Sequence, residues 1–431
     1  MAGTPTPRLP RASAGLSGEV SRYVTEHARP PRVSGFFPVI ETQEGPSMRY
    51  YASIFATLLR SLPRGVFNSI VERHDGDRYT KSFDAWRHLV SLIYAQLAGV
   101  ESLRALEAGW NAHAHHHYHL GSGPVARSTL ADANRRRDPG LFAEVFARLS
   151  AFAGASAKRE GDALIRLIDA TPIPLAELFA WAGWNGRTRG LKLHVVYGPQ
   201  SDHPMRIAIT PANVNDVTVG RAFPIEPGAT YVFDKAYVDY GWWTELDEAG
   251  CRFVTRPKTN VPFTVLATLT PPNSAGDGFF VATDEVVQLA SQSRGRLAFP
   301  LRRLTVDIHD GRRFTLLCND LDAAANDIAA LYKQRWQIEL LFRWIKQHLR
   351  IKSFLGRSQN AVRLQIITAM IAFLLLRIAQ RQSRSTLPPV RFAGLIRTCL
   401  FTRKPLTRLD KPPDIPAKPQ PDPNQLNFAY A

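Results

Sequence analysis

The order of apolar and polar residues divides the chain into segments with different predicted structure. From Tyr50 to about Phe152, apolar residues recur at helical spacing in "SIFATLLRSL", "FDAWRHLVSLIYAQLAGV" and "GLFAEVFARLSAFA", which predicts an all-helical region. Short runs of β-formers follow, each bounded by Gly, Pro, Asn or Asp: "DALIRLIDA", "GLKLHVVYG", "MRIAITPA", "TYVFDKAY" and "CRFVTRPK". Helix-compatible stretches alternate with these runs, and this alternation is typical of an α/β sheet.

A second group of strand-like segments lies between about residues 259 and 317. The stretches "GFFVATDEVVQL" and "GRLAFPLRRLTVDIHDGRRFTLLC" alternate as antiparallel strands do, and His309-Asp310-Gly311 predicts a hairpin turn. We therefore expect a β-rich insertion. After Asn319-Asp320 the pattern is helical again to about Arg403. Its apolar run from Ile366 to Leu376 is well short of the roughly 20 residues that span a bilayer, so a buried helix is expected.

Both ends of the sequence differ in composition from the segments between them. Residues 1–45 are rich in Pro, Ser, Arg and Gly without helical or strand periodicity, which predicts a disordered arm. Residues 404–431 include "KPPDIPAKPQPDPNQ" and are predicted to form a Pro-rich tail. Between them, the patterns predict a helical domain over residues 46–155 and an α/β core over residues 156–403.

The charge of the chain favours a polyanionic partner. Lys and Arg number 54 against 37 Asp and Glu, for a net charge of +17, and the segment from Arg335 to Lys404 holds fourteen basic residues and one acid. Nucleic acid is the leading interpretation, and an anionic membrane surface is the weaker one. The three cysteines are far apart without a CxxC pair, so neither a disulfide framework nor a thiolate zinc site is indicated. With no signal pattern at the start, we expect a cytoplasmic, nucleoid-associated protein.

Three acidic residues are candidates for a metal site. Asp169 closes the apolar run "ALIRLID" and Asp234 closes "YVFD", so both are predicted at the carboxyl ends of strands, where open α/β sheets form their sites. Glu339, on a predicted helix, could join them. Three neighbouring carboxylates repel one another unless divalent cations such as Mg²⁺ or Mn²⁺ neutralise them. Two such ions, about 3.5–4 Å apart, can activate the attacking oxygen and stabilise the leaving oxygen of a phosphodiester.

The predicted helix "YKQRWQIELLFRWIK" carries a polar stripe around Glu339. At about 100° per residue, one narrow face holds Tyr332, Arg335, Glu339, Arg343 and Lys346. Taken alone, such a stripe is more often a solvated ion-pair face, and an Asp after a strand often starts a turn. The combination in the order strand, strand, helix favours a site. Trp336 and Trp344 lie off the stripe and are predicted to be packing residues.

The spacing Tyr332-x2-Arg335-x3-Glu339-x6-Lys346 resembles the Y-R-E-K signature of DDE transposases of the insertion-sequence-four type. "LIDATPI" and "VFDKAY", which hold Asp169 and Asp234, are similar to the two acidic blocks of that family. The second block usually reads Asp-x-Gly-Tyr, whereas Ala236 replaces the Gly here. The stretches "ESLRALEAGWNAH" and "ARSTLADANRRRD" are similar to the helical domain that often precedes this core. The resemblance covers roughly residues 50 to 400.

The resemblance implies a fold and a reaction. The fold would be an α/β, ribonuclease-H-like catalytic core with a β-rich insertion, preceded by an all-helical N-terminal domain. Asp169 and Asp234 would lie on neighbouring strands and Glu339 on the helix after the insertion. The reaction would be metal-dependent cleavage at the ends of a transposon, followed by attack of the freed 3′-hydroxyl on target DNA. The partner would be double-stranded DNA, and the cofactor two Mg²⁺ ions, for which Mn²⁺ can substitute.

The resemblance also implies roles for individual side chains. Asp169, Asp234 and Glu339 would be the catalytic groups and the metal ligands. The other residues of the polar stripe would bind DNA phosphates: Tyr332, Arg335, Arg343 and Lys346. In some relatives an aromatic side chain of the insertion stacks on a flipped base. The insertion here offers no Trp but has Phe263, Phe279, Phe280 and Phe299.

Two further motifs have more than one interpretation. "PVARSTLADANRRRD" ends in Arg135, Arg136 and Arg137, which either bind transposon-end DNA or form a solvated basic turn. "HAHHHYH" contains His113, His115, His116, His117 and His119. Because adjacent His residues cannot all face one ion, a loop with incidental metal affinity is favoured over a metal cluster.

The sequence leaves rival functions open. One is a catalytically inactive DNA-binding protein derived from a transposase, and another is a basic protein that coats nucleic acid. The presence of Asp169, Asp234 and Glu339 favours the enzyme. A homodimer in the DNA complex would bring two transposon ends together, although no heptad run indicates one.

Overall fold

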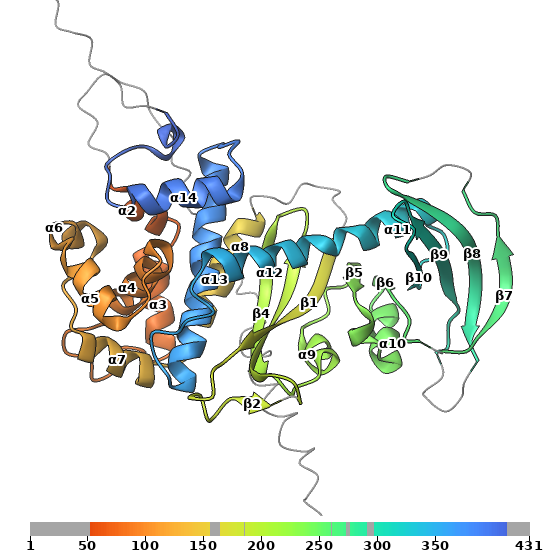
Figure 1. The fold of residues 1–431 in the computed structure, drawn as a ribbon, viewed down its shortest axis with the longest axis horizontal. Helices are drawn as coiled ribbons and strands as arrows, with labels where there is room; N and C mark the ends of the chain where they lie inside the picture. Colours follow the sequence, from red (N-terminus) through yellow and green to blue (C-terminus); the bar gives the residue numbers. More distant parts are fainter. Residues whose placement is uncertain are drawn as a thin grey trace, which may run out of the picture.

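A computed structural model describes residues 52–155, 164–184, 186–259, 261–272, 276–290 and 297–411. The predicted arm over residues 1–45 and most of the predicted Pro-rich tail lie outside the described residues. The described part is elongated (Figure 1). Helices lie at one end, a mixed α/β core lies in the middle, and the strands of the insertion lie at the other end.

The N-terminal region is helical, as predicted. Its helices are α2 (Ile54–Leu59), α3 (Arg64–Arg73), α4 (Ala85–Ala98), α5 (Leu103–Asn111), α6 (Ala114–His117), η1 (Tyr118–Leu120), α7 (Arg127–Arg136) and α8 (Pro139–Ala155). Side chains of Ser53, Asp84 and Ser102 start α2, α4 and α5, each accepting a hydrogen bond from a backbone N–H of the first turn. Gly99, with a φ of 72°, ends α4 in the left-handed conformation that glycine tolerates best.

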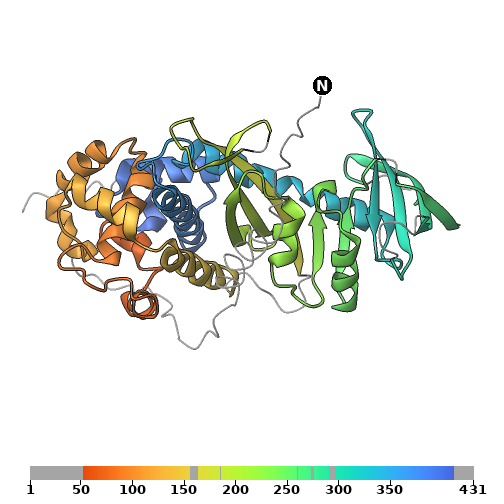
Figure 2. The ribbon, with the colours of Figure 1, turned by 90° about the horizontal axis from the view of Figure 1, so that it is seen from below.

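Two helices from late in the chain complete this region: α13 (Gln359–Gln382) and α14 (Pro389–Cys399). α13 packs against α4, α7 and α8, and Figure 2 shows it among the N-terminal helices. Among the described residues, α13 is long and apolar enough to cross a membrane, but 89% of its apolar stretch is buried inside the structure. The predicted buried helix is therefore confirmed, and it shares a core with helices more than two hundred residues earlier.

The α/β core is built on a mixed sheet. Its elements are β1 (Ile165–Pro174), β2 (Gly183–Trp184), β3 (Arg189–Gly198), β4 (His203–Pro211), α9 (Asp216–Ala222), β5 (Thr230–Phe233), η2 (Lys235–Tyr237), α10 (Tyr240–Glu248) and β6 (Arg252–Thr255). β3 is antiparallel to β1 and β4, whereas β5 and β6 run parallel to β1. The resulting order, β4-β3-β1-β5-β6, is that of the predicted ribonuclease-H-like core.

The insertion extends the same sheet. Its strands β7 (Phe263–Leu269), β8 (Phe279–Leu289), β9 (Leu301–Ile308) and β10 (Arg313–Cys318) are antiparallel neighbours. β10 also pairs with β6, so insertion and core form one ten-stranded sheet. The predicted hairpin between β9 and β10 is confirmed, because the Gly311 N–H donates to the carbonyl of Ile308 over 2.9 Å and Gly311 has a φ of +86°.

The helix that carries the polar stripe differs from the prediction. It is interrupted at Arg335, between α11 (Ala325–Gln334) and α12 (Trp336–His348). The Arg335 N–H donates to the carbonyl of Tyr332 over 3.0 Å, and the Ile338 N–H donates to the carbonyl of Arg335 over 3.2 Å. These bonds span three residues rather than four, so the turn at Arg335 is tighter than an α-helix. α11 and α12 run from the insertion across the core towards α13 (Figure 1).

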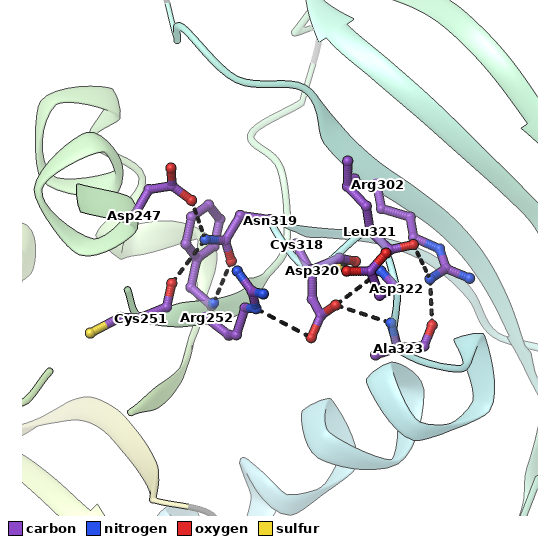
Figure 3. A network of polar contacts seen from close by, with 11 residues as sticks. Asp247, Cys251, Arg252, Arg302, Cys318, Asn319, Asp320, Leu321, Asp322 and Ala323 are labelled. Atoms are coloured by element: carbon purple, nitrogen blue, oxygen red, sulfur yellow. Dashed lines mark hydrogen bonds and ion pairs between the residues drawn. The ribbon is translucent and has the colours of Figure 1, made fainter. Parts of the chain in front are cut away.

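A polar network fixes the point where α11 begins (Figure 3). Asn319, directly after β10, donates a hydrogen bond of 2.9 Å to the carbonyl of Cys251, which precedes β6. The Asp320 carboxylate accepts a hydrogen bond of 3.0 Å from the Ala323 N–H, and Arg302 of β9 donates to the Ala323 carbonyl. Core, insertion and α11 are thus joined at one place, which sets the direction of the helix that follows.

Candidate active site

The two predicted aspartates lie side by side and face the same way. β1 and β5 pair in parallel, and Asp169 and Asp234 each follow the last residue of that paired register. Side chains of a strand alternate between the two faces of its sheet. Leu167 and Val232, two positions earlier, belong to the large core that α12 also joins, so both carboxylates face the α12 side. Asp169 lies within β1 rather than at its end, because β1 continues along β3 to Pro174.

Glu339 reaches the same place from α12. One guanidinium connects it to the first aspartate: Arg335 Nη2 lies 2.5 Å from Glu339 Oε1, and Arg335 Nη1 lies 3.5 Å from Asp169 Oδ2. The tight turn at Arg335 places this side chain at the junction of α11 and α12, facing β1. The structure therefore brings the three acids to one site, although they are far apart in sequence.

The three acids share one surface pocket. Its volume is about 370 Å³, and its lining consists of Asp169, Ala170, Thr171, Asp234, Arg335, Glu339, Phe342, Arg343 and Lys346. Six of the seven residues predicted for the catalytic centre and the polar stripe are in this lining. The acids lie beside cations, so the pocket combines oxygen donors of the kind that divalent cations prefer with positive charges of the kind that attract anions.

Burial and the neighbouring carboxylates weaken the acidity of Asp169. The pKa of its carboxyl is raised from 3.8 to about 6, chiefly by burial, and the charges of Glu339 and Asp234 add to the shift. The Ala170 N–H, which donates to Asp169 Oδ1 over 2.8 Å, and the Arg335 charge both oppose it. A carboxylate in this position gains from any additional cation close to it.

The three carboxylates are chemically suited to a divalent cation, but their side chains would have to move to bind one together. Carboxylate oxygens are the ligands that Mg²⁺ and Mn²⁺ prefer. Within the part of the chain that the structure describes, no three His, Cys, Asp or Glu side chains are placed to hold one ion together. The positive charge between Asp169 and Glu339 is supplied by Arg335 instead.

The remaining stripe residues fall into two groups. Arg343 and Lys346 line the pocket, and burial together with the neighbouring Lys352 lowers the pKa of Lys346. Tyr332 is buried behind the pocket instead of lining it. Its ring lies 5.7 Å from Arg335 Cζ, and burial raises the pKa of its hydroxyl. As the side chain lies, Tyr332 supports Arg335 rather than presenting its hydroxyl to a phosphate.

The three arginines of α7 are not equivalent. Arg135 pairs with Asp132 on the same helix, and Arg136 is exposed. Arg137, predicted to bind DNA, is only 7% exposed in its side chain and donates to Asp77 Oδ1 over 3.3 Å and to the carbonyl of Phe83 over 3.2 Å. As its side chain lies, Arg137 is directed to these partners instead of the solvent, so the structure gives its predicted DNA contact no support.

Trp336 is a side chain that the sequence prediction misjudged. It was expected to pack, but it is 50% exposed and its ring lies 5.7 Å from Arg343 Cζ. Trp344 does pack, with its ring 5.1 Å from that of Phe373. The helical spacing does indicate this position, because Trp336 lies three residues before Glu339 and residues at that separation are neighbours on the surface of a helix.

Tyr237, which keeps the tyrosine of the second acidic block, lies beneath the carboxylates. It is 1% exposed, and the pKa of its hydroxyl is raised well above the usual value, first by burial and then by Asp169, Asp216 and Asp234. Its place within the block "VFDKAY", three residues after Asp234, is the sequence feature that points to this supporting position.

Comparison with known proteins places the chain in a family. Residues 160–375 match the model of the "Transposase DDE domain", and residues 51–122 match a "Domain of unknown function (DUF4372)". The chain is 54% identical over 304 residues to the "Putative transposase y4zB" of Sinorhizobium fredii, covering 70% of this chain and 85% of that protein. It is 29% identical over 246 residues to the "Probable transposase for insertion sequence element IS5377" of Geobacillus stearothermophilus, covering 56% and 64%.

Among solved structures, the chain is similar to that titled "Cryo-EM structure of piggyBac transposase synaptic complex with hairpin DNA (SNHP)". The TM-score is 0.45 and the identity 11%, over 87% of this chain and 86% of that one.

The chain belongs to the Transposase DDE domain family. The predicted family is thus confirmed, and so is the predicted α/β fold with a helical N-terminal region. The protein is a transposase, a class of enzyme that acts on DNA.

Proposed function

We propose that this transposase binds double-stranded DNA at transposon ends, cleaves it with divalent metal ions, and joins the freed 3′-hydroxyl to target DNA. One observation carries the proposal: Asp169, Asp234 and Glu339 converge on one pocket whose rim is basic. Asp169, Asp234 and Glu339 would hold Mg²⁺ or Mn²⁺, and two bound ions would supply the activated oxygen nucleophile and stabilise the leaving oxygen.

The cations around the pocket support a role in binding the scissile strand. Arg343 is exposed and Lys346 is half-buried on the wall of the pocket, so phosphate oxygens can reach both. Arg335 has two tasks in this proposal. It neutralises Asp169 and Glu339 in the absence of metal, and it would bind a phosphate oxygen when metal ions occupy the site.

A basic groove next to the pocket supports a longer DNA path. The groove has a volume of about 620 Å³ and includes Lys235, which directly follows Asp234. It continues over the insertion past Arg256 and Lys258. In the helical region, Arg136 is the remaining exposed candidate of α7, with Arg135 held by its ion pair.

Several finer points belong to the same proposal. From the Y-R-E-K spacing, we propose that the enzyme is of the insertion-sequence-four type. Because its proposed substrate is DNA, we expect the enzyme in the cytoplasm, at the nucleoid. Two transposon ends must be brought together, so a homodimer on DNA is the expected assembly.

The test is a nicking assay on supercoiled plasmid that carries the ends of the element, with Mg²⁺ or Mn²⁺. Glu339→Gln should abolish cleavage and retain or strengthen DNA binding, because it removes a metal ligand and one negative charge. Glu248→Gln, an exposed residue at the end of α10, is the matched control and should cut normally. Cleavage by Glu339→Gln at the rate of the control would refute the site. A wild-type protein that binds DNA but never nicks it would favour the inactive alternative.

A further inference from the structure

A second basic pocket lies in the segment that matches the domain of unknown function. It has a volume of about 330 Å³ and shares no residue with the catalytic pocket. Its lining consists of Ala52, Ser53, Ala56, Arg60, His116, His119 and Arg403. This pocket includes part of the histidine-rich motif, to which the proposed reaction assigns no role.

The pocket is assembled from both ends of the described chain. A bridge joins Ser53 to Arg403, the Ile54 N–H donates to the carbonyl of Thr402 over 3.0 Å, and the Phe55 N–H donates to that of Leu400 over 2.8 Å. These contacts hold Arg403 beside the start of α2. The pocket therefore depends on the closure of the helical region by residues that follow α14.

Aromatic stacking holds the histidine rings at the wall. The ring of Phe401 lies 4.1 Å from that of His113, at an interplanar angle of 29°, and 4.9 Å from that of His116, at 17°. His117 points the other way, into the core, where it stacks on Trp110 at 4.3 Å. The motif thus divides into one buried ring and several that remain near the surface, and its members do not surround a common point.

The pocket has a uniform charge. Its lining contains two guanidinium groups and two imidazoles, and no carboxylate. Arg60 is exposed, and within the described residues its side chain takes part in no hydrogen bond or ion pair. Burial lowers the pKa of His116, and the neighbouring His115, His113, Arg403 and His119 lower it further, in that order. An anion in the pocket would offset these repulsions and favour protonated His116.

We infer that this pocket binds a phosphate group at a site separate from the catalytic centre. Guanidinium forks match phosphate oxygens in two-point hydrogen bonds, and imidazolium groups add charge. The phosphate is either part of the DNA backbone or a free phosphate ion. The backbone source rests on the proposed DNA function, whereas the phosphate chemistry itself does not.

The experiment compares Arg60→Ala with Arg104→Ala in the full chain. Arg104 is an exposed arginine of α5 outside both pockets, so the two variants lose the same charge. Inorganic phosphate is titrated by calorimetry at about pH 8, where the ion is chiefly doubly charged. Duplex DNA is titrated by fluorescence anisotropy in EDTA over a series of salt concentrations. Urea unfolding checks that both variants remain folded, and Arg60→Lys tests recovery by a conserved charge.

We expect Arg60→Ala to bind phosphate about tenfold or more weakly than Arg104→Ala, the effect of one charge-assisted hydrogen bond. If the source is DNA, the Arg60→Ala variant should also bind duplex more weakly, with a salt slope lower by about 1. Weaker phosphate binding with unchanged duplex binding would identify free phosphate as the ligand. Equal phosphate binding by Arg60→Ala and Arg104→Ala would overturn the inference, even if the catalytic site is right.

Discussion

Replacement of Asp169 by Asn should stabilise the metal-free protein while abolishing cleavage. Asp169 is half-buried on β1 and lies near two other carboxylates, with Arg335 as its cationic neighbour at 3.5 Å. Asn keeps the size of the side chain and can accept the Ala170 N–H as the carboxylate does. It removes the charge that the folded state disfavours. The same charge is what a divalent ion needs, so stability and activity should change in opposite directions.

The size of the effect follows from the pKa. Folding raises the pKa of Asp169 from 3.8 to about 6, so the folded protein holds the proton more tightly than the unfolded chain does. The stability that this proton confers is complete below the lower value and is lost as the pH rises through about 6. A shift of about two units corresponds to about 3 kcal/mol above that pH. The Asp169 side chain is 21% exposed, and we expect Asn to recover about 1–3 kcal/mol at neutral pH.

The assay is urea unfolding in EDTA at about pH 7.5 and about pH 4.5, on either side of the folded-state pKa. Asp322→Asn is the control, because it removes one exposed negative charge from the same basic chain. Asp169→Asn should exceed the control in unfolding free energy at the higher pH, and the difference should shrink at the lower one. Added Mg²⁺ should stabilise the wild type and not the variant. A variant no more stable than Asp322→Asn at neutral pH would refute the electrostatic argument.

Three further outcomes are expected. Asp284→Asn should lower the free energy of unfolding by about 3–5 kcal/mol, because it leaves the buried Arg302 without its carboxylate partner. Asp307→Asn is the control, because its ion pair with Arg313 is exposed, and it should change urea unfolding little. Leu374→Ala in α13 should lower it by about 2–5 kcal/mol, since this side chain is 0% exposed, and a normal unfolding curve would contradict the central place of α13. Lys346→Ala should weaken duplex binding in an anisotropy assay and reduce its salt slope by about 1, and an unchanged slope would remove Lys346 from the phosphate contacts.

Local patterns in the sequence were sufficient for the elements and for much of the site. Short runs of β-forming residues and their boundary residues predicted the strands next to Asp169 and Asp234, and helical spacing predicted the stripe around Glu339. These inferences depend on geometry that repeats along the backbone, so residues a few positions apart contain the signal. The Y-R-E-K spacing added the resemblance to DDE transposases, and the comparisons confirm that family.

The tertiary structure decided everything that depends on neighbours remote in sequence. It buried Arg137 against Asp77, exposed Trp336, placed Arg335 between two carboxylates and brought Arg403 to the start of the helical region. No local pattern contains these outcomes, because burial and charge pairing depend on which distant segments pack together. The sequence by itself determined which groups the protein has and whether each lies in a helical or a strand-rich segment. Only long-range packing decided which of these groups come into contact and how exposed to solvent each one is.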